Sequence, residues 1–280
     1  MSNIIDGKLV SEHIKTYVKG EIDKLTKSGS RPTLAVIIVG NDQASKIYVN
    51  NKKKACEFTG IKSVEYALDE SVSEYELLEL IHKLNNDDGI DGILCQLPLP
   101  NHINEDIVIN SISPKKDVDC FNQANVGKVW QGKYELAPCT PMGIIELLDY
   151  YKIPIEGKNC VIVGRSNIVG KPMAALLLER NATVTVCHSK TQDLCSFTRN
   201  ADVIVAAVGR ANFITADMVK EGAVVIDVGI NRVDGKIYGD VDFDNVKVKA
   251  SFITPVPGGC GLTTTATLMK NTLLAYKNKL

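Results

Sequence analysis

The sequence has almost no net charge, with 32 basic and 33 acidic residues among 280. Proteins that bind nucleic acid or an anionic membrane through their overall charge carry a strong basic excess, so we expect neither partner. No apolar run approaches the ~20 residues of a membrane span. The first residues, Met1 to Asp6, lack the basic and apolar regions of a secretory signal. We therefore expect a cytoplasmic protein.

The eight cysteines lack the spacing of a metal site or a disulfide framework. The sequence contains no C-x-x-C pair and no paired-histidine spacing, and several cysteines lie inside apolar, strand-like runs. We interpret them as reduced core residues of a cytosolic protein and predict no metal site.

The length favours two domains, each large enough to bury its own core. Strand-like apolar segments alternate with helical patterns, which is typical of an α/β fold with parallel sheets. The predicted strands lie within residues 32–40, 63–68, 89–100, 160–164, 182–187, 201–209 and 222–229. The last four predict a doubly wound parallel sheet in the second half.

One glycine turn organises that second half. The apolar run 160–163 ends at Gly164, a polar turn extends to Gly170, and Pro172 suits the first turn of a helix. Such a turn directs backbone N–H groups and a helix dipole at a ligand, which favours a phosphate. The spacing departs from the standard dinucleotide fingerprint, since Ser166 replaces the second glycine and Gly170 comes one residue late. The alternative is a tight turn without a ligand.

The end of the next predicted strand bears on which dinucleotide is bound. An NAD site would place an acidic residue here to accept from the ribose 2′-hydroxyl. The sequence instead has Ser189 and Lys190, with Arg165 in the preceding turn. These groups suit a 2′-phosphate, so we predict NADP. Each of the three is alternatively an ordinary solvated residue.

In the first half, the predicted helix 42–58 carries Ser45, Tyr48 and Lys52 on one face. A ring beside an ammonium group, after a parallel strand, suits a ligand site. The alternative is a packed tyrosine and a solvated lysine, because Lys52 begins a run of three lysines.

Two further polar features lie in the first half. Gln96 ends an apolar strand, so its amide is either bound to backbone or faces a site. Asp117 and Asp119 flank a valine, which puts both acids on one side of an extended loop. The alternative for this pair is a surface turn.

Taken together, these segments resemble the bifunctional methylenetetrahydrofolate dehydrogenase/methenyltetrahydrofolate cyclohydrolase family, nearly from end to end. The matching motifs are Ala44-Ser45 with Tyr48-Val49 and Lys52, then residues 92–100, 116–119, 138–141, 164–166 with 169, 170 and 172, 187–189, 227–231, 239–241 and 254–259. Gly-Arg-Ser at 164–166 is this family's own variant of the glycine turn.

The resemblance implies an N-terminal α/β catalytic domain over residues 1–139, completed by a C-terminal helix at 264–280. It implies a C-terminal Rossmann-like NAD(P)-binding domain over residues 140–263. The active site would lie in the interdomain cleft, and a homodimer would form through the NAD(P) domains.

The implied reactions are the NADP-dependent oxidation of methylenetetrahydrofolate and the hydrolysis of its product to 10-formyltetrahydrofolate, within one-carbon metabolism and purine biosynthesis. Lys52 matches the catalytic lysine, Gln96 the glutamine that supports it, Tyr48 the ring that packs on the folate, and Asp119 the acid that holds the pterin. The implied cofactor contacts are Gly164, Arg165, Ser166, Ser189, Gly209 and Ile230. The implied substrate contacts are these four catalytic-domain residues with Leu97, Pro98, Pro255, Gly258 and Gly259.

The sequence departs from the family pattern at three places. Cys120 replaces a usual glycine, Ala211 a common proline, and 261–263 reads Gly-Leu-Thr where Gly-Pro-Met is usual. Because the last loop lines the folate side in the family, a dehydrogenase without the hydrolytic step stays an alternative. A shikimate-dehydrogenase-like reductase and an NADP-sensing binding protein are the other two.

Overall fold

The computed structural model describes residues 3–25 and 31–279; positions 1, 2, 26–30 and 280 of the predicted domains lie outside this part. The chain divides into two compact units. Unit one comprises Met1–Ser11 and Thr140–Thr264, and unit two comprises Glu12–Cys139 and Thr265–Leu280. The predicted domains placed residues 1–139 together, whereas here the first eleven residues cluster with 140–264. The physical reason is a short strand, β1 (Asn3–Ile4), which pairs in parallel with β11 (Phe252–Ile253) of unit one.

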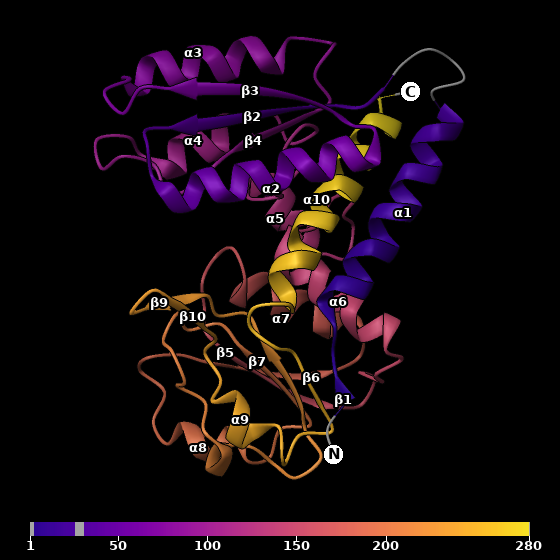
Figure 1. Ribbon diagram of the computed structural model, residues 1–280, viewed down its shortest axis with the longest axis vertical. Coiled ribbons are helices and arrows are strands. Elements are labelled where there is room, and N and C mark those ends of the chain that lie inside the picture. The colour runs from indigo at the N-terminus through magenta and orange to yellow at the C-terminus, as the bar shows by residue number, and fades with distance from the viewer. Residues whose placement is uncertain (1–2, 26–30, 280) are drawn as a thin grey trace. The chain divides into compact units, whose positions relative to one another are not determined.

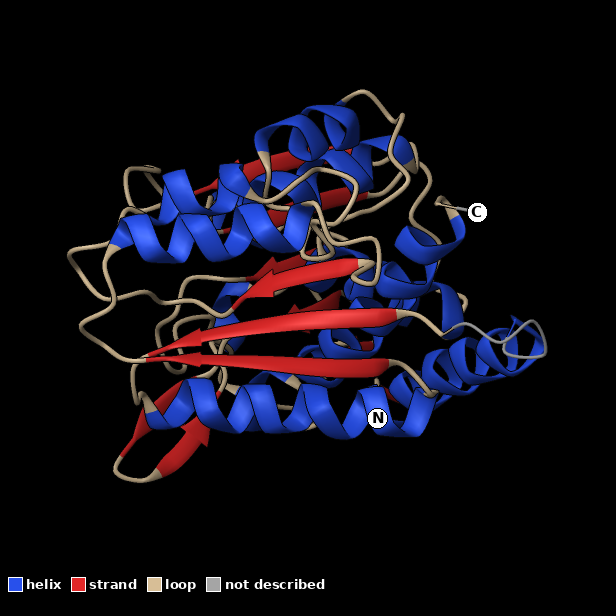
Figure 2. Cartoon of the chain, turned by 90° about the horizontal axis from the view of Figure 1, so that it is seen from above, coloured by secondary structure: helices blue, strands red, loops and turns tan. Residues whose placement is uncertain are grey.

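Unit two contains a three-stranded parallel sheet in the order β3-β2-β4. Its elements are most of α1 (Gly7–Leu25), then β2 (Thr33–Val39), α2 (Gln43–Thr59), β3 (Lys62–Leu68), α3 (Glu74–Asn85), β4 (Gly92–Cys95), α4 (Glu105–Ser111), α5 (Gln123–Trp130) and most of α10 (Cys260–Lys277). All seven residues of the central strand β2 are buried, which explains its continuous apolar sequence. Figure 2 shows the three arrows side by side with their heads at the same end.

Helices cover both faces of this small sheet. Figure 1 shows α3 on one side of the strands and α2 on the other. Leu77, Ile81 and Leu84 of α3 are buried against residues of β2 and β4, as their helical spacing requires. Helix α2 begins where the Asp42 carboxylate accepts from the Ser45 N–H and ends at Gly60, in the left-handed conformation. These two caps determine where α2 begins and ends.

Unit one contains a six-stranded parallel sheet in the order β1-β11-β8-β7-β5-β6. Its remaining elements are α6 (Cys139–Tyr150), β5 (Asn159–Val163), α7 (Gly170–Glu179), β6 (Thr183–Cys187), α8 (Leu194–Thr198), β7 (Val203–Ala206), the 3-10 turn η2 (Ala216–Met218), β8 (Val224–Asp227), the hairpin β9 (Asn231–Val233) and β10 (Lys236–Tyr238), and α9 (Phe243–Val246). The four predicted strands are confirmed. Two-residue strands β1 and β11 were not predicted, because two residues show no periodicity.

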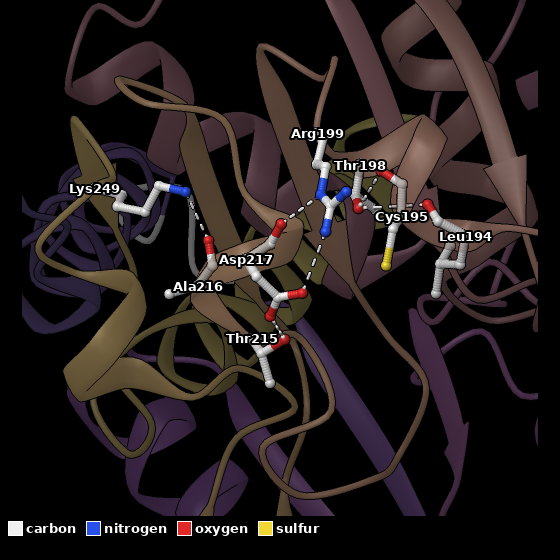
Figure 3. Close-up of polar contacts among 8 residues, drawn as sticks. All are labelled: Leu194, Cys195, Thr198, Arg199, Thr215, Ala216, Asp217 and Lys249. Atoms are coloured by element: carbon white, nitrogen blue, oxygen red, sulfur yellow. Dashed lines mark hydrogen bonds and ion pairs between the residues drawn. The ribbon is translucent and has the colours of Figure 1, made fainter.

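Polar contacts tie α8 to the connection between β7 and β8 (Figure 3). The Arg199 guanidinium donates to the Asp217 carbonyl at 2.6 Å and to its carboxylate at 3.4 Å. Lys249 donates to the Ala216 carbonyl at 2.8 Å, which fixes η2 from the other side. These contacts hold the short turn η2 from both sides.

Candidate functional site

The Lys52 ammonium group and the Gln96 amide are in direct contact. Lys52 lies on α2 and donates to Gln96 Oε1 at 2.9 Å. Gln96 follows β4, and its backbone N–H donates to the Ile37 carbonyl at 2.8 Å. Its amide nitrogen donates to the Leu97 carbonyl at 2.7 Å, so the amide oxygen is the atom that faces the lysine. Gln96 is thus bound to backbone through its amide nitrogen, and its oxygen binds Lys52, which is partly buried rather than freely solvated.

Tyr48 lies one turn before Lys52 on the same helix and is 39% exposed. The alternative interpretation required a tyrosine packed in the core, and this exposure contradicts it. Ser45, a further turn back, is buried. The face of α2 thus presents an accessible aromatic ring next to the Lys52–Gln96 pair.

The two acids of the Asp-Val-Asp loop have different surroundings. Asp117 is buried, and its carboxylate accepts from the Asn122 N–H at 2.8 Å and from the Asn125 amide at 3.0 Å. Burial raises the pKa of Asp117 to about 6. These contacts stabilise the loop, so the surface-turn interpretation is wrong.

Asp119 is partly buried. Burial raises the pKa of Asp119, while the charge of Lys52 acts in the opposite direction. The charge of Lys52 therefore acts on Asp119, and both residues belong to unit two together with Gln96.

Two residues that support this group were missed from the sequence. Asn271 of α10 is buried and donates to the carbonyls of Val118 and Ala137, each at 2.8 Å. The Cys139 thiol contacts the Asp119 carboxylate, and burial raises the pKa of this thiol well above its usual range. The sequence offers no clear signal for Asn271, because it stands between two other polar residues, Lys270 and Thr272.

The remaining predicted substrate contacts divide between the units. Leu97 and Pro98 directly follow Gln96 in unit two, where Pro98 is exposed. Pro255, Gly258 and Gly259 form a turn in unit one. This turn is anchored because the Gly258 carbonyl accepts from the Gly7 N–H at 2.8 Å, and a side chain at Gly7 would collide with the turn.

The glycine turn of unit one has the form that the sequence predicted. A Cβ atom at Gly164 would collide with the Ala207 carbonyl, and one at Gly170 with the Gly164 carbonyl. The Ser166 hydroxyl accepts from the N–H groups of Val169 and Gly170 at 3.2 and 3.4 Å. The turn and the first residues of α7 therefore combine close backbone approach with a helix N-terminus, which fits a phosphate-bearing cofactor.

The predicted 2′-phosphate contacts lie at adjacent strand ends. Strands β5 and β6 are neighbours with Val163 opposite Cys187, and the Gly164 N–H donates to the Cys187 carbonyl at 2.9 Å. Arg165 and Ser189 each follow one of these strands by two residues, and both are exposed. The geometry therefore allows one ligand to contact both.

Gly209 and Ile230 follow β7 and β8, the next strands of the same sheet. Gly209 has a φ of 67°, and Ile230 is an apolar side chain that is 45% exposed. The carboxyl ends of parallel strands are where nucleotides bind in such sheets. All six predicted cofactor residues thus follow the carboxyl ends of four neighbouring strands.

The described part of the chain offers neither a metal centre nor a membrane helix. Within residues 3–25 and 31–279, no group of three or more His, Cys, Asp or Glu side chains could hold a metal ion. In the same part of the chain, no helix is long and apolar enough to cross a membrane.

The sequence matches two family models, and relatives cover it almost completely. The model of the tetrahydrofolate dehydrogenase/cyclohydrolase catalytic domain matches residues 5–119, and that of the NAD(P)-binding domain matches residues 138–280. A protein of Agathobacter rectalis, named bifunctional protein FolD, is 59% identical over 99% of this chain and 100% of that protein. The two-domain α/β fold class is confirmed by these matches.

Solved structures give the same result. The bifunctional enzyme FolD of Campylobacter jejuni has a TM-score of 0.98 and 52% identity, with all of both chains covered. The Trypanosoma brucei dehydrogenase-cyclohydrolase, solved with NADP and an inhibitor, has a TM-score of 0.95 and 36% identity over 99% of this chain and 98% of that one. Shikimate dehydrogenase of Thermus thermophilus, at 16% identity and a TM-score of 0.55, shares the fold alone.

We predict that Asn271→Leu loosens the loop that carries Asp119. The isosteric change removes the amide donor from both carbonyls, so that Val118 keeps only the Cys139 thiol at 3.3 Å and the Ala137 carbonyl loses its Asn271 partner, which costs about 1–3 kcal/mol in the free energy of unfolding. Hydrogen exchange should accelerate in residues 117–139. Asn278→Ala is the control, because that amide is exposed and donates to the Glu135 carboxylate at 3.2 Å, away from both carbonyls. Unchanged exchange in Asn271→Leu would contradict the assigned clamp.

Proposed function

Because the chain belongs to the tetrahydrofolate dehydrogenase/cyclohydrolase family, we propose that it oxidises methylenetetrahydrofolate with NADP⁺ and hydrolyses the product to 10-formyltetrahydrofolate. The observation that carries the proposal is the 2.9 Å contact between Lys52 and Gln96, beside the exposed ring of Tyr48 and the Asp119 carboxylate. Relatives named as bifunctional and a relative solved with NADP support it.

The oxidation needs positioning more than it needs protein chemistry. NADP⁺, when bound, accepts the hydride that leaves the methylene bridge of the folate. The chain must hold the two ring systems face to face and keep water out. In this proposal Tyr48 packs on the folate, with Leu97 and Pro98 beside it and the turn at Pro255, Gly258 and Gly259 as the remaining contact.

The cofactor contacts follow from the carboxyl edge of the unit-one sheet. Gly164 allows close approach of the backbone, and Ser166 lies in the turn before α7. Arg165 and Ser189 supply a guanidinium and a hydroxyl for the 2′-phosphate. Gly209 and Ile230 then border the other end of the dinucleotide.

The hydrolysis requires a group that can both accept and donate a proton. Water adds to the methenyl carbon and loses one proton to a base, which gives a neutral hydroxyl adduct. The bond from that carbon to the ring nitrogen then breaks and the nitrogen receives a proton, while the adduct's hydroxyl proton leaves to solvent as the formyl C=O forms, so that one proton is released overall. Lys52 in its neutral form accepts the first proton and returns one to the nitrogen. Gln96 can orient the lysine through its oxygen without adding a negative charge, which would hold the lysine in its charged form.

Asp119 has a separate role in the proposal. An ionised carboxylate can accept two parallel hydrogen bonds from the amide N–H and the amino group of the pterin. The Cys139 thiol and the loop contacts of Asp117 hold this carboxylate in place. A small carboxylate substrate such as shikimate would have no use for this acceptor.

The alternatives of a dehydrogenase without hydrolysis and of a sensor are disfavoured by the same contact. Neither function needs a lysine held by a neutral amide. The Gly-Leu-Thr departure also leaves this pair untouched: Thr263 is buried and donates to the Cys260 carbonyl at 2.9 Å, while Leu262 is 41% exposed.

We further propose a cytoplasmic homodimer that supplies formyl groups for purine biosynthesis. Strand β6 is one edge of the six-stranded sheet, and Val186 on it and Leu178 on α7 are exposed apolar residues. An open edge with exposed apolar side chains favours pairing with another chain. Sedimentation of the purified protein at micromolar concentration tests this assembly.

The test of the main proposal is one mixture. Purified protein, methylenetetrahydrofolate and NADP⁺ are combined, and NADPH and methenyltetrahydrofolate are followed by absorbance. NADPH that rises while methenyltetrahydrofolate stays near its spontaneous background supports both activities. If NADPH and methenyltetrahydrofolate rise in step, the protein is a dehydrogenase without the hydrolytic activity. If no NADPH forms with NADP⁺, and no NADH forms with NAD⁺, the folate reaction is refuted.

We predict that Lys52→Met lowers the hydrolysis of added methenyltetrahydrofolate by at least about 100-fold, because general acid–base catalysis is lost. Hydride transfer survives in part, since it needs no proton carrier. Lys53→Met is the matched control, because Lys53 is the next residue of the same helix and its ammonium group is exposed. Hydrolysis by Lys52→Met at the wild-type rate would remove Lys52 from the mechanism.

We also predict that Arg165→Ala raises the KM for NADP⁺ by about tenfold or more, because a charge-assisted contact to the 2′-phosphate is lost. The KM for NAD⁺ should change little. Lys171→Ala removes a nearby positive charge that is bound to Asn167 at 2.6 Å, and it should alter neither constant selectively. Equal losses for both cofactors in Arg165→Ala would show that Arg165 does not contact the 2′-phosphate.

A further inference from the structure

We propose that Asp240, which lies outside the predicted contacts, is a positioning residue for the nicotinamide half of the cofactor. The inference rests on the proposed function and deepens it. Asp240 is fully buried, and its carboxylate accepts four hydrogen bonds, three of them from consecutive backbone N–H groups. A carboxylate so placed determines the course of the backbone that surrounds it.

The three consecutive N–H groups belong to the turn after β7. Asp240 Oδ2 accepts from Val208 and Gly209 at 2.6 and 3.0 Å. Oδ1 accepts from the N–H of Arg210 at 2.9 Å. Successive N–H groups that converge in this way form an anion-binding concavity, and here a side chain of the same chain fills it. The Asp240 carboxylate therefore holds the backbone of the turn at Gly209, which is itself exposed.

The same carboxylate also holds the segment after β8. Asp240 Oδ1 accepts from the Asn231 amide at 2.9 Å, and Asn231 directly follows Ile230. A Cβ atom at Gly229 would collide with the Asp240 carboxylate, so the chain passes this carboxylate in direct contact. Asp240 thereby joins the two segments that carry Gly209 and Ile230.

A second buried carboxylate holds Asp240 itself. Asp227, the last residue of β8, accepts from the N–H groups of Gly229 and Asp240 at 2.9 and 2.8 Å, and from that of Val241 at 2.9 Å. Its own N–H donates to the Thr254 hydroxyl at 2.7 Å, which connects the segment after β11. The two carboxylates therefore connect three strand ends at one edge of the sheet.

The order of the strands decides which half of the cofactor meets this edge. Arg165 and Ser189 follow β5 and β6, so a 2′-phosphate bound there places the adenosine half over these two strands. The sheet continues from β5 to β7 and β8. The nicotinamide half therefore extends over the ends of β7 and β8, where Asp240 sets the positions of Gly209 and Ile230.

The test is the Asp240→Asn variant. An asparagine keeps the volume but offers one acceptor oxygen in place of two, so an N–H group of the turn loses its partner. We expect the KM for NADP⁺ to rise about tenfold and the affinity for NADPH, measured by fluorescence titration, to fall by a similar factor. Hydrolysis of added methenyltetrahydrofolate needs no hydride transfer and should stay within about twofold of wild type.

A purely structural role gives a different pattern. General destabilisation would lower the dehydrogenase and the cyclohydrolase together, and this outcome, or unchanged constants for NADP⁺ and NADPH, would overturn the inference. The titration needs no turnover, so it tests Asp240 even if the proposed reaction is refuted.

Two further variants keep the test decisive. Asp202→Asn is the matched control: Asp202 accepts from the Asn159 N–H at 2.9 Å and from Lys220 at 2.6 Å, at the opposite edge of the same sheet. It should leave the constants for NADP⁺ unchanged. If Asp240→Asn does not fold, Asn231→Ala keeps the carboxylate and its three backbone contacts and removes the Asn231 amide, which donates to Asp240 at 2.9 Å and to the Tyr238 carbonyl at 3.3 Å. A rise of a few fold in the KM for NADP⁺ alone supports the inference, and no rise refutes it.

Discussion

Buried polar side chains that bind the loop backbone at strand ends are the interaction on which both proposed sites depend. A parallel strand that ends at the edge of a sheet leaves N–H and C=O groups of the following loop to be paired, since unpaired buried groups are costly. Here carboxylates and amides pair with them. Asp117 accepts from the loop after it, and Asp240 accepts from three consecutive N–H groups. The loops consequently have defined shapes although they carry little regular structure.

Both units contain buried polar side chains that bind loop backbone, but these side chains support different parts of the proposed site. In unit two, Asp117 and Asn271 fix the loop that carries Asp119, and Gln96 uses its backbone and its amide at the end of β4 to hold Lys52. In unit one, Asp227 and Asp240 connect segments whose outer residues border the proposed cofactor site. In unit two the loop backbone is held by Asp117 and Asn271 and not by Asp119, and in unit one the turn after β7 is held by Asp240 and not by Ile230. This separation lets a ligand bind without breaking the contacts that shape its site.

The sequence was informative wherever one segment alone determines the structure. The glycine turn at Gly164 and the common face of Tyr48 and Lys52 both follow from local spacing, and both are present in the structure. Asn271 and Asp240 could not be found in this way, because their partners lie 134 to 153 and 9 to 32 positions away. Strand β1 was missed for a related reason: only its pairing with β11 makes two residues a strand.

The departure at Cys120 shows how such a loop tolerates an unusual residue. Cys120 has a φ of 60°, a left-handed conformation that costs a non-glycine residue about 1–2 kcal/mol. The side chain is fully buried, and its thiol donates to the Leu136 carbonyl at 3.2 Å. Burial also raises the pKa of this thiol, so the thiol stays protonated and can donate its hydrogen bond to the Leu136 carbonyl. The contacts of the cysteine offset the backbone cost, and the shape of the loop remains determined by Asp117 and Asn271, which leaves Asp119 in place.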